Sequence, residues 1–190
     1  MTSKETPAKT VGHFKTITEH KYRVMKHCFA VGLYAQGLLH DLSKFAPVEF
    51  LNGCRYYQEG KRSPNNAERE DRGYSLAWMH HKGRNRHHYE YWNDYNAVRE
   101  EGKPPIIYVQ MPRKYVVEML MDRISASETY RGTQYTQHDP LKYFLNGRGR
   151  TLMHPQTAKE LERMLRILDR RGQAELDRFV RDYYLKGYPV

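Results

Sequence analysis

The sequence predicts an all-α fold, and two observations carry that prediction. Apolar residues recur every three or four positions over several long segments, which is the period of an amphipathic helix. Almost no segment of useful length alternates apolar and polar residues with period two, the pattern of a half-buried strand. With 190 residues, 39% of them hydrophobic, the chain is long enough for one compact domain with a core.

The first part of the chain is expected to consist of helices separated by turns rich in glycine and proline. Residues 1–12 are small, polar and basic and are expected to form a flexible tail. Ile17, Val24 and Val31 then recur at helical spacing, and Pro47 suits the first turn of a later helix. The elements predicted on these grounds are helices over residues 13–30, 38–42, 47–57 and 74–82. Residues 60–75 are expected to form a loop, with one polar helical turn as the alternative.

The second part is expected to follow the same pattern. Tyr115 to Ala126 carries the clearest amphipathic stripe in the chain. The other elements predicted here are a helix over residues 87–98, an extended loop over 102–112, a turn-rich stretch over 132–149 and two helices over 156–171 and 173–186. We expect the last two helices to form a hairpin. Their apolar stripes either complete the domain's own core or form a homodimer interface.

The composition rules out several classes of protein. No stretch approaches the about 18 to 20 apolar residues that a membrane-spanning helix needs, and residues 1–15 are too polar for a signal peptide. Two cysteines, Cys28 and Cys54, are too few for a disulfide scaffold and fit the cytoplasm, where we expect the protein to be located. The net charge of +10 favours polyanionic partners, although such a surplus is also common on ordinary protein surfaces.

The dipeptide His40-Asp41 follows two leucines, Leu38 and Leu39, that we expect to be buried. Burying either ionisable group without a partner is costly. A divalent metal removes that cost, because imidazole and carboxylate are both good ligands for Zn, Fe or Mn. For this dipeptide alone, a helix-terminal histidine followed by a capping aspartate is the structural alternative.

Other histidines strengthen the metal hypothesis. His20 and His27 are seven residues apart, which is two helical turns, so we expect both on the inward face that carries Val24. Four more lie in the segment 78–88 beside three basic residues, and this mixture suits a site that holds a metal and binds an anion. These four are His80, His81, His87 and His88. An exposed basic loop is the alternative for this segment.

A carboxylate occurs later in a predicted helix. Asp122 shares a helical face with Met119 and Ala126, and this face is largely apolar. A carboxylate in that position needs a cation, which is Arg123, another side chain or a metal.

The order of these residues resembles that of the HD superfamily of metal-dependent phosphohydrolases. The text HKYRV that begins at His20 looks like the superfamily's first-histidine helix, and residues 38–44 look like its hallmark stretch, LLHD-x-x-K. In two-metal relatives, extra histidines lie between the HD pair and the final aspartate, as in this chain. The resemblance covers about residues 13–130, which also look like a bacterial and phage family with the texts HDLSK, HHKGRNRHH and EYW.

The resemblance implies an all-α, HD-like metal-binding domain, which we expect to span residues 13–150. The helical hairpin over 151–190 has no counterpart in the resemblance, and its apolar stripes lead us to expect that it packs on the same domain. It implies one or two divalent ions from the set Fe, Mn, Zn, Ni and Co, since histidine-rich ligation disfavours Mg. The first ion would be held by His20, His40, Asp41 and Asp122. The second would be held by one member of each of the pairs His80/His81 and His87/His88, with Asp41 able to bridge. The interval between His20 and the HD pair is short for the superfamily, which leaves His13 and His27 as alternative first ligands.

The resemblance also implies that a metal-activated water attacks the phosphorus of a phosphomonoester or phosphodiester, with a nucleotide as one candidate. Asp41 and Lys44 are the expected catalytic residues, because one helical turn carries Lys44 to the rim of the site. The residues expected to bind the substrate are Lys44, Arg84, Asn85, Arg86 and Arg123. Surface solubility is the alternative role for each basic residue.

Two other functions stay open at this stage. The charge of +10 and tyrosine-rich segments such as Tyr56-Tyr57 and Tyr183-Tyr184 also suit a nucleic-acid-binding module with a metal-stabilised core, because aromatic rings stack on bases. An HD site that senses a nucleotide without turning it over is the third hypothesis.

Overall fold

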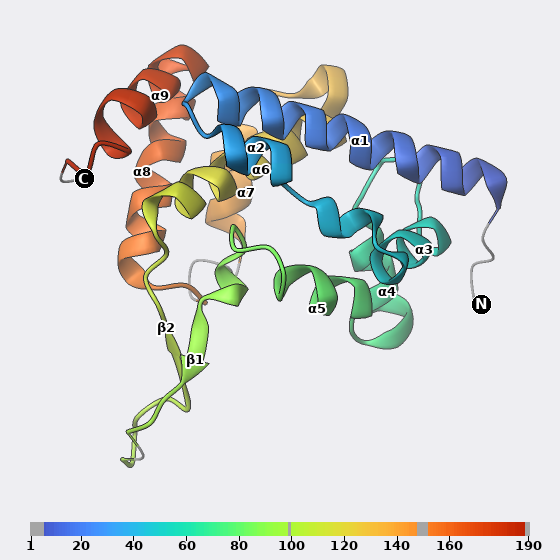
Figure 1. The fold of residues 1–190 in the computed structure, drawn as a ribbon, viewed down its shortest axis with the longest axis horizontal. Helices are drawn as coiled ribbons and strands as arrows, with labels where there is room; N and C mark the ends of the chain where they lie inside the picture. Colours follow the sequence, from blue (N-terminus) through green and yellow to red (C-terminus); the bar gives the residue numbers. More distant parts are fainter. Residues whose placement is uncertain (1–5, 99, 148–151, 189–190) are drawn as a thin grey trace.

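The computed structural model describes residues 6–98, 100–147 and 152–188, and it confirms the all-α prediction (Figure 1). The long helices are α1 (Pro7–Ala30), α6 (Arg113–Arg131) and α8 (Pro155–Arg171). The shorter helices are α2 (Tyr34–Leu39), α3 (Pro47–Arg55), α4 (Pro64–Arg72), α5 (Leu76–Lys82), α7 (Asp139–Asn146) and α9 (Gln173–Phe179). None of the described helices carries an apolar stretch that would take it across a bilayer.

Helix α1 begins earlier than the sequence pattern predicts. Thr6 caps it, because its hydroxyl accepts a hydrogen bond from the Lys9 backbone amide at 3.3 Å, and Pro7 fills the first turn. Residues 7–12, expected to be a flexible tail, therefore form the first turns of the helix. Residues 1–5 of that expected tail lie outside the described residues.

Two short helices replace expected loops. Helix α4 lies within residues 60–75, and Gly73 ends it with a φ of 81°, a conformation that favours glycine. Helix α7 lies within the expected turn-rich stretch 132–149 and has Pro140 in its first turn. Helix α4 is almost entirely polar and offers no apolar period. In α7, Leu141, Phe144 and Leu145 do recur at helical spacing, but the helix has only eight residues and lies between turn-forming residues, so it was missed.

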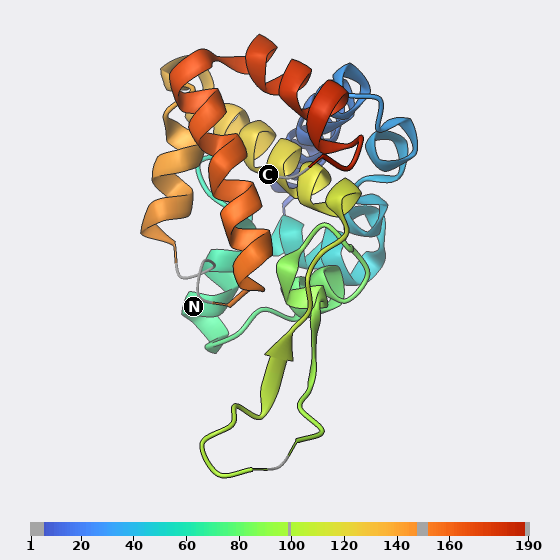
Figure 2. The ribbon, with the colours of Figure 1, turned by 90° about the vertical axis from the view of Figure 1, so that its left-hand side faces the viewer.

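The predicted helix over residues 87–98 is wrong. The chain there makes a single 3₁₀ turn and then strand β1 (Asn93–Tyr95), which pairs antiparallel with β2 (Ile106–Tyr108) in the expected loop 102–112. This two-stranded hairpin projects from the helical body (Figures 1 and 2). Its pairing joins residues that are up to 15 positions apart, which a local periodicity does not report.

Helix α6 lies at the centre of the fold, between α1 and α8 (Figure 2). Residues 116–121 are all buried, so α6 is enclosed over this stretch and is not the one-sided amphipathic helix that the sequence predicts. Two polar side chains of α6, Glu118 and Asp122, lie close to this apolar packing, and they serve the site described below.

The C-terminal helices α8 and α9 contribute to the common core. Leu161, Leu165 and Leu168 on α8 and Leu176 on α9 are at most 1% exposed and belong to the common core. Their apolar stripes therefore fill the chain's own interior. The expected boundary between residues 150 and 151 lies outside the described residues.

Candidate metal centre

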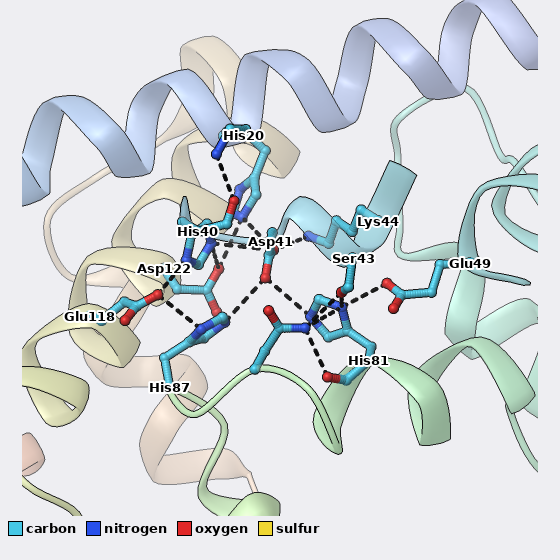
Figure 3. Close-up of polar contacts among 12 residues, drawn as sticks. His20, His40, Asp41, Ser43, Lys44, Glu49, His81, His87, Glu118 and Asp122 are labelled. Carbon is cyan, nitrogen blue, oxygen red and sulfur yellow. Dashed lines mark hydrogen bonds and ion pairs between the residues drawn. The ribbon is translucent and has the colours of Figure 1, made fainter. Parts of the chain in front are cut away.

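The centre is built where α1, the end of α2, α5 and α6 meet (Figure 3). His40 caps α2, and Asp41 follows with a φ of 54°, a left-handed conformation that is uncommon outside glycine. Lys21 of α1 holds this bend by donating hydrogen bonds to the carbonyl oxygens of Leu38 and His40, both at 2.7 Å. A strained residue held in this way is typical of functional sites.

The bend changes the expected burial of this segment. Leu38 and Leu39, predicted to be buried, are 55% and 65% exposed, whereas His40 and Asp41 are 1% and 2% exposed. The chain therefore turns its polar side chains inward and its leucines outward. This burial supports the argument for a metal, because two ionisable groups lie in the interior and each needs a partner there.

The first ligand group consists of His20, His40, Asp41 and Asp122. His20 Nε2 lies 2.9 Å from Asp122 Oδ1 and 3.9 Å from Asp41 Oδ2. His40 Nε2 lies 3.2 Å from Asp41 Oδ2 and 3.7 Å from Asp122 Oδ1. Ligand atoms bound to one ion at about 2.1 Å lie about 3 to 4 Å apart, so this spacing suits a single divalent ion.

The second ligand group consists of Asp41, His81, His87 and His88. The Nε2 atoms of His81 and His87 each lie 3.3 Å from Asp41 Oδ1. All four ligand atoms lie within 4.8 Å of one another. Asp41 thus presents Oδ2 to the first group and Oδ1 to the second, which is the geometry of a bridging carboxylate (Figure 3).

Two glutamates orient the histidines from behind. Glu118 Oε1 lies 3.0 Å from His40 Nδ1 and 3.1 Å from His87 Nδ1. Glu49 Oε2 lies 2.8 Å from His81 Nδ1. When each Nδ1–H donates to its glutamate, each Nε2 keeps its lone pair and faces Asp41. This arrangement of carboxylate, imidazole and open Nε2 is the usual setting of metal-ligating histidines.

The buried polar atoms of the centre fit a cation. Six of them make no well-aligned hydrogen bond although they are buried, namely Nε2 of His20, His40, His87 and His88 and both carboxylate oxygens of Asp41. Buried polar atoms almost always find a partner. Convergent imidazole and carboxylate atoms of this kind are the donors that a divalent ion prefers.

The charge of the bridging residue is fixed by its neighbours. Burial opposes ionisation of Asp41, but His40 and Lys44 outweigh it and hold the pKa of this carboxyl well below its usual range. Lys44 Nζ lies 2.6 Å from Asp41 Oδ2. Burial would lower the pKa of His40, yet Asp41 and Asp122 outweigh it and raise that pKa well above its usual value. An ionised Asp41 is the form that binds a cation.

Two other histidines are held neutral. Burial, with a smaller contribution from Lys44, lowers the pKa of His20. Burial, with His87 and His81 nearby, lowers the pKa of His88 well below its usual value. A neutral imidazole is the ligating form, so these two residues need not lose a proton to bind an ion near neutral pH.

A cavity of about 830 Å³ opens onto both groups, a volume in the usual range for small-molecule sites. Four basic residues in its lining are Lys44, Arg69, Arg123 and Lys142, of which Lys44 and Arg123 are close in sequence to the ligands Asp41 and Asp122. Its aromatic lining consists of Tyr57, Trp78, Tyr89, Tyr130, Tyr143 and Phe144. The cavity can therefore receive an anionic group beside the ligands and a flat or apolar group beyond it.

Comparison with known proteins identifies the family. A family model described as a family of unknown function, DUF5662, matches residues 9–167. The chain belongs to this family. The DUF5662 match includes both ligand groups and ends within α8. No curated protein and no solved structure gives a significant match.

Most of the candidate ligands meet in the structure, and three, His13, His27 and His80, belong to neither group. His80 lies outside both groups, because its Nδ1 contacts Glu49 Oε1 at 2.6 Å. His27 is also outside, since its Nε2 contacts Glu128 Oε1 at 3.1 Å. From the pair His87/His88, both members reach the second group, where one was expected.

The predicted substrate-binding residues also divide. Lys44 and Arg123 line the cavity, whereas the Arg84 guanidinium donates to the carbonyl oxygen of His80 at 3.4 Å and Arg86 donates to the Tyr115 hydroxyl at 3.4 Å. The Asn85 amide donates to Ser43 Oγ at 2.7 Å and to the His81 carbonyl at 2.8 Å. Asn85 therefore holds the end of α5 in place through contacts within the protein, and these contacts occupy its amide group.

Sequence reasoning missed the two orienting glutamates. Glu118 precedes Asp122 by one helical turn, so helical spacing could have placed it beside the ligands. Glu49 gives no such signal, because it reaches His81 only through the packing of α3 against α5.

Proposed function

We propose that this protein is an HD-type metal-dependent phosphohydrolase with two adjacent divalent ions. The observation that carries the proposal is that Asp41 directs one carboxylate oxygen into each of two ligand groups, beside a cavity with a cationic lining. The ligand order along the chain supports it, because the first group follows the HD pattern.

The donor set indicates which ions fit. The first group offers two imidazoles and two carboxylates, and the second offers three imidazoles and the shared carboxylate. Such nitrogen-rich groups favour Fe, Mn, Zn, Ni or Co over Mg. When bound, ions of this kind polarise a phosphoryl group and lower the pKa of a bound water towards 7.

The protein's own residues would position and neutralise the substrate. Lys44 holds its ammonium group against Asp41 at the cavity wall, where it can also reach a phosphoryl oxygen. Arg123 lines the same wall, and its buried Nε has no hydrogen-bond partner among the described residues. That atom is free to donate to an anion. The aromatic walls suit a phosphate ester that carries an apolar or planar group.

The test is turnover of simple chromogenic esters. Protein stripped of metal and then loaded with Mn²⁺, Fe²⁺ or Zn²⁺ should hydrolyse p-nitrophenyl phosphate or bis(p-nitrophenyl) phosphate, and EDTA should abolish the activity. Lys44→Met should lower kcat/KM by about a hundredfold, comparable to removal of one transition-state donor. Lys26→Met, which removes an exposed lysine on α1, is the matched control and should leave the rate unchanged.

Circular dichroism melting curves check that each variant folds. Folded protein with no turnover of either ester under any of the three metals would contradict the proposal. Equal turnover in EDTA would contradict the role of the ions.

A further inference from the structure

A second hollow lies on α8, outside the metal ligands. It is a groove of about 1370 Å³ bordered by α8, the end of α7, Tyr108 of β2 and Phe179 of α9. Five basic side chains line it, namely Lys159, Arg163, Arg166, Arg170 and Arg171. Among the described residues of its lining, Glu162 is the single acidic side chain. The proposed hydrolase chemistry does not use this groove.

The basic residues form a regular stripe. Lys159, Arg163, Arg166 and Arg170 are separated by four, three and four residues, so they lie along one face of α8 over about 16 Å. All four are exposed. Like charges at these spacings destabilise an isolated helix. Glu162 pairs with Arg166 at 2.7 Å and offsets part of that repulsion. A bound chain of anions would relieve the rest.

An aromatic column stands beside the stripe. The Arg163 guanidinium lies 5.5 Å from the centre of the Phe179 ring. Phe179 stacks on Tyr183 with ring centres 5.5 Å apart, and Tyr183 stacks on Tyr188 at 5.1 Å. Arg113 fixes the far end by donating to the Tyr188 carbonyl oxygen at 2.9 Å. Tyr183 and Tyr188 are 39% and 53% exposed, so parts of their rings face solvent.

We propose that this groove binds single-stranded nucleic acid. The stripe would contact consecutive phosphates, and Tyr188, the exposed ring at the end of the column, would offer a face on which an unpaired base stacks. Single-strand binding surfaces use this combination of cations and aromatic rings. A duplex keeps its bases stacked inside, and a lone phosphate needs no stripe of this length. The proposal uses no metal ligand.

The groove also adjoins the proposed active site. Asn146 and Gly147 line both the groove and the metal-centre cavity. A strand bound along α8 can thus extend towards the ligands. This last step rests on the proposed function, whereas binding to the groove does not.

The test is fluorescence anisotropy with a fluorescein-labelled 12-nucleotide oligothymidylate, in EDTA and at 50 to 200 mM salt. Four phosphate contacts predict a slope of log affinity against log salt of about −3. The double substitution Lys159→Ala with Arg170→Ala should lower affinity at least tenfold at 50 mM salt and make the slope shallower by about 1.4. Lys15→Ala with Lys26→Ala removes two exposed lysines of α1 and is the charge-matched control, which should stay within about twofold of the wild type.

A second pair of variants tests the column. Tyr188→Leu, at the exposed end of the column, should weaken binding about tenfold without changing the salt slope, because stacking involves no counterion release. Tyr22→Leu, at an exposed tyrosine on α1, should have no effect. Melting curves confirm that each variant is folded.

Three results would overturn the proposal. The first is that Lys15→Ala with Lys26→Ala loses as much affinity as Lys159→Ala with Arg170→Ala. The second is that the wild type binds a labelled 12-base-pair duplex as tightly as the single strand. The third is that the wild type does not bind the single strand at 50 mM salt. Oligonucleotide binding in EDTA together with no ester turnover in any metal would support the groove and contradict the hydrolase. Ester turnover without oligonucleotide binding would do the reverse.

Discussion

The two halves of the candidate metal centre use the same Asp41 but are held in different ways. The first group lies on α1, α6 and the bend after α2, among residues of the main core such as Val24 and Leu120, both fully buried. The histidines of the second group lie on short α5 and the loop after it. Polar contacts from Glu49, Ser43 and Asn85 hold that segment in place.

This difference separates two ways of preparing a ligand. Apolar packing fixes the first group, so its geometry changes only if the core changes. Side-chain hydrogen bonds from short elements fix much of the second group, so it can rearrange at lower cost than a group set in the main core. We therefore expect the ion of the first group to bind more tightly, and a chelator to remove the ion of the second group first.

Among changes confined to one half of the centre, the largest expected effect comes from removing a ligand of the second group. His88→Ala should halve the metal content, from two ions per chain to one, and lower ester turnover at least a hundredfold, more than loss of an outer partner costs. Plasma mass spectrometry of the purified variant gives the metal content. Retention of two ions would show that His88 is not a ligand and that the two groups are not distinct.

Substitution of the orienting glutamates should change the affinities of the two ions differently, with a smaller effect than loss of a ligand. Glu49→Gln should weaken only the second ion, by about 10- to 100-fold, because Glu49 contacts His81 and no ligand of the first group. Glu118→Gln should weaken both ions by a similar factor, since Glu118 contacts His40 and His87. Calorimetric titration of stripped protein with Mn²⁺ measures both affinities. Identical profiles for the two variants would contradict this division.

The wall beside the first group should show a pH effect on stability. Burial, with Lys44 nearby, lowers the pKa of His13 to about 4. Between pH 6.5 and 4 the unfolded chain binds a proton there that the folded chain excludes, so His13 lowers the free energy of unfolding as the pH falls through this window. His13→Gln should make that pH dependence shallower by at most one proton, about 1.4 kcal/mol per pH unit.

Urea unfolding of metal-stripped protein at pH 7, 6 and 5 measures the His13 effect. The variant should also keep both ions, because His13 belongs to neither ligand group. An unchanged slope would mean that His13 titrates freely. Loss of an ion in His13→Gln would show that His13 is a ligand of the first group.

The smallest expected effect is at His27 and His80, the two predicted ligands of α1 and α5 that belong to neither ligand group. His27→Gln and His80→Gln should keep two ions per chain, since these histidines contact Glu128 and Glu49 and belong to neither ligand group. Metal analysis of both variants checks this. If His80→Gln holds only one ion per chain while Glu49→Gln still holds two under the same conditions, His80 is a ligand of the second group.

Much of the first group could be predicted from sequence, because its members are marked by local pattern. His20 lies on the inward face of a periodic helix, and Asp122 lies on an apolar face where a carboxylate needs a cation. The all-α fold follows from the same periodicity. The exposure of Leu38 and Leu39 could not be predicted, since it depends on the left-handed bend at Asp41.

The second group was predictable only as a cluster. Four histidines within residues 80–88 indicated a site, but the choice among them depends on which side of α5 and its loop faces Asp41. That choice is made by contacts with distant residues, Glu49 and Glu118, and no periodicity reports such contacts. The hairpin of β1 and β2 escaped prediction for the same reason, since strand pairing is non-local.

The most direct test of the shared-carboxylate centre is the metal content of Asp41→Asn. Asparagine tolerates the left-handed backbone and keeps the size of the side chain, so the variant removes the charge with little other change. After reconstitution with Mn²⁺, plasma mass spectrometry should find two ions per chain in the wild type and none in Asp41→Asn. A folded Asp41→Asn protein that still holds two ions would contradict the account, as would a folded wild type that holds none.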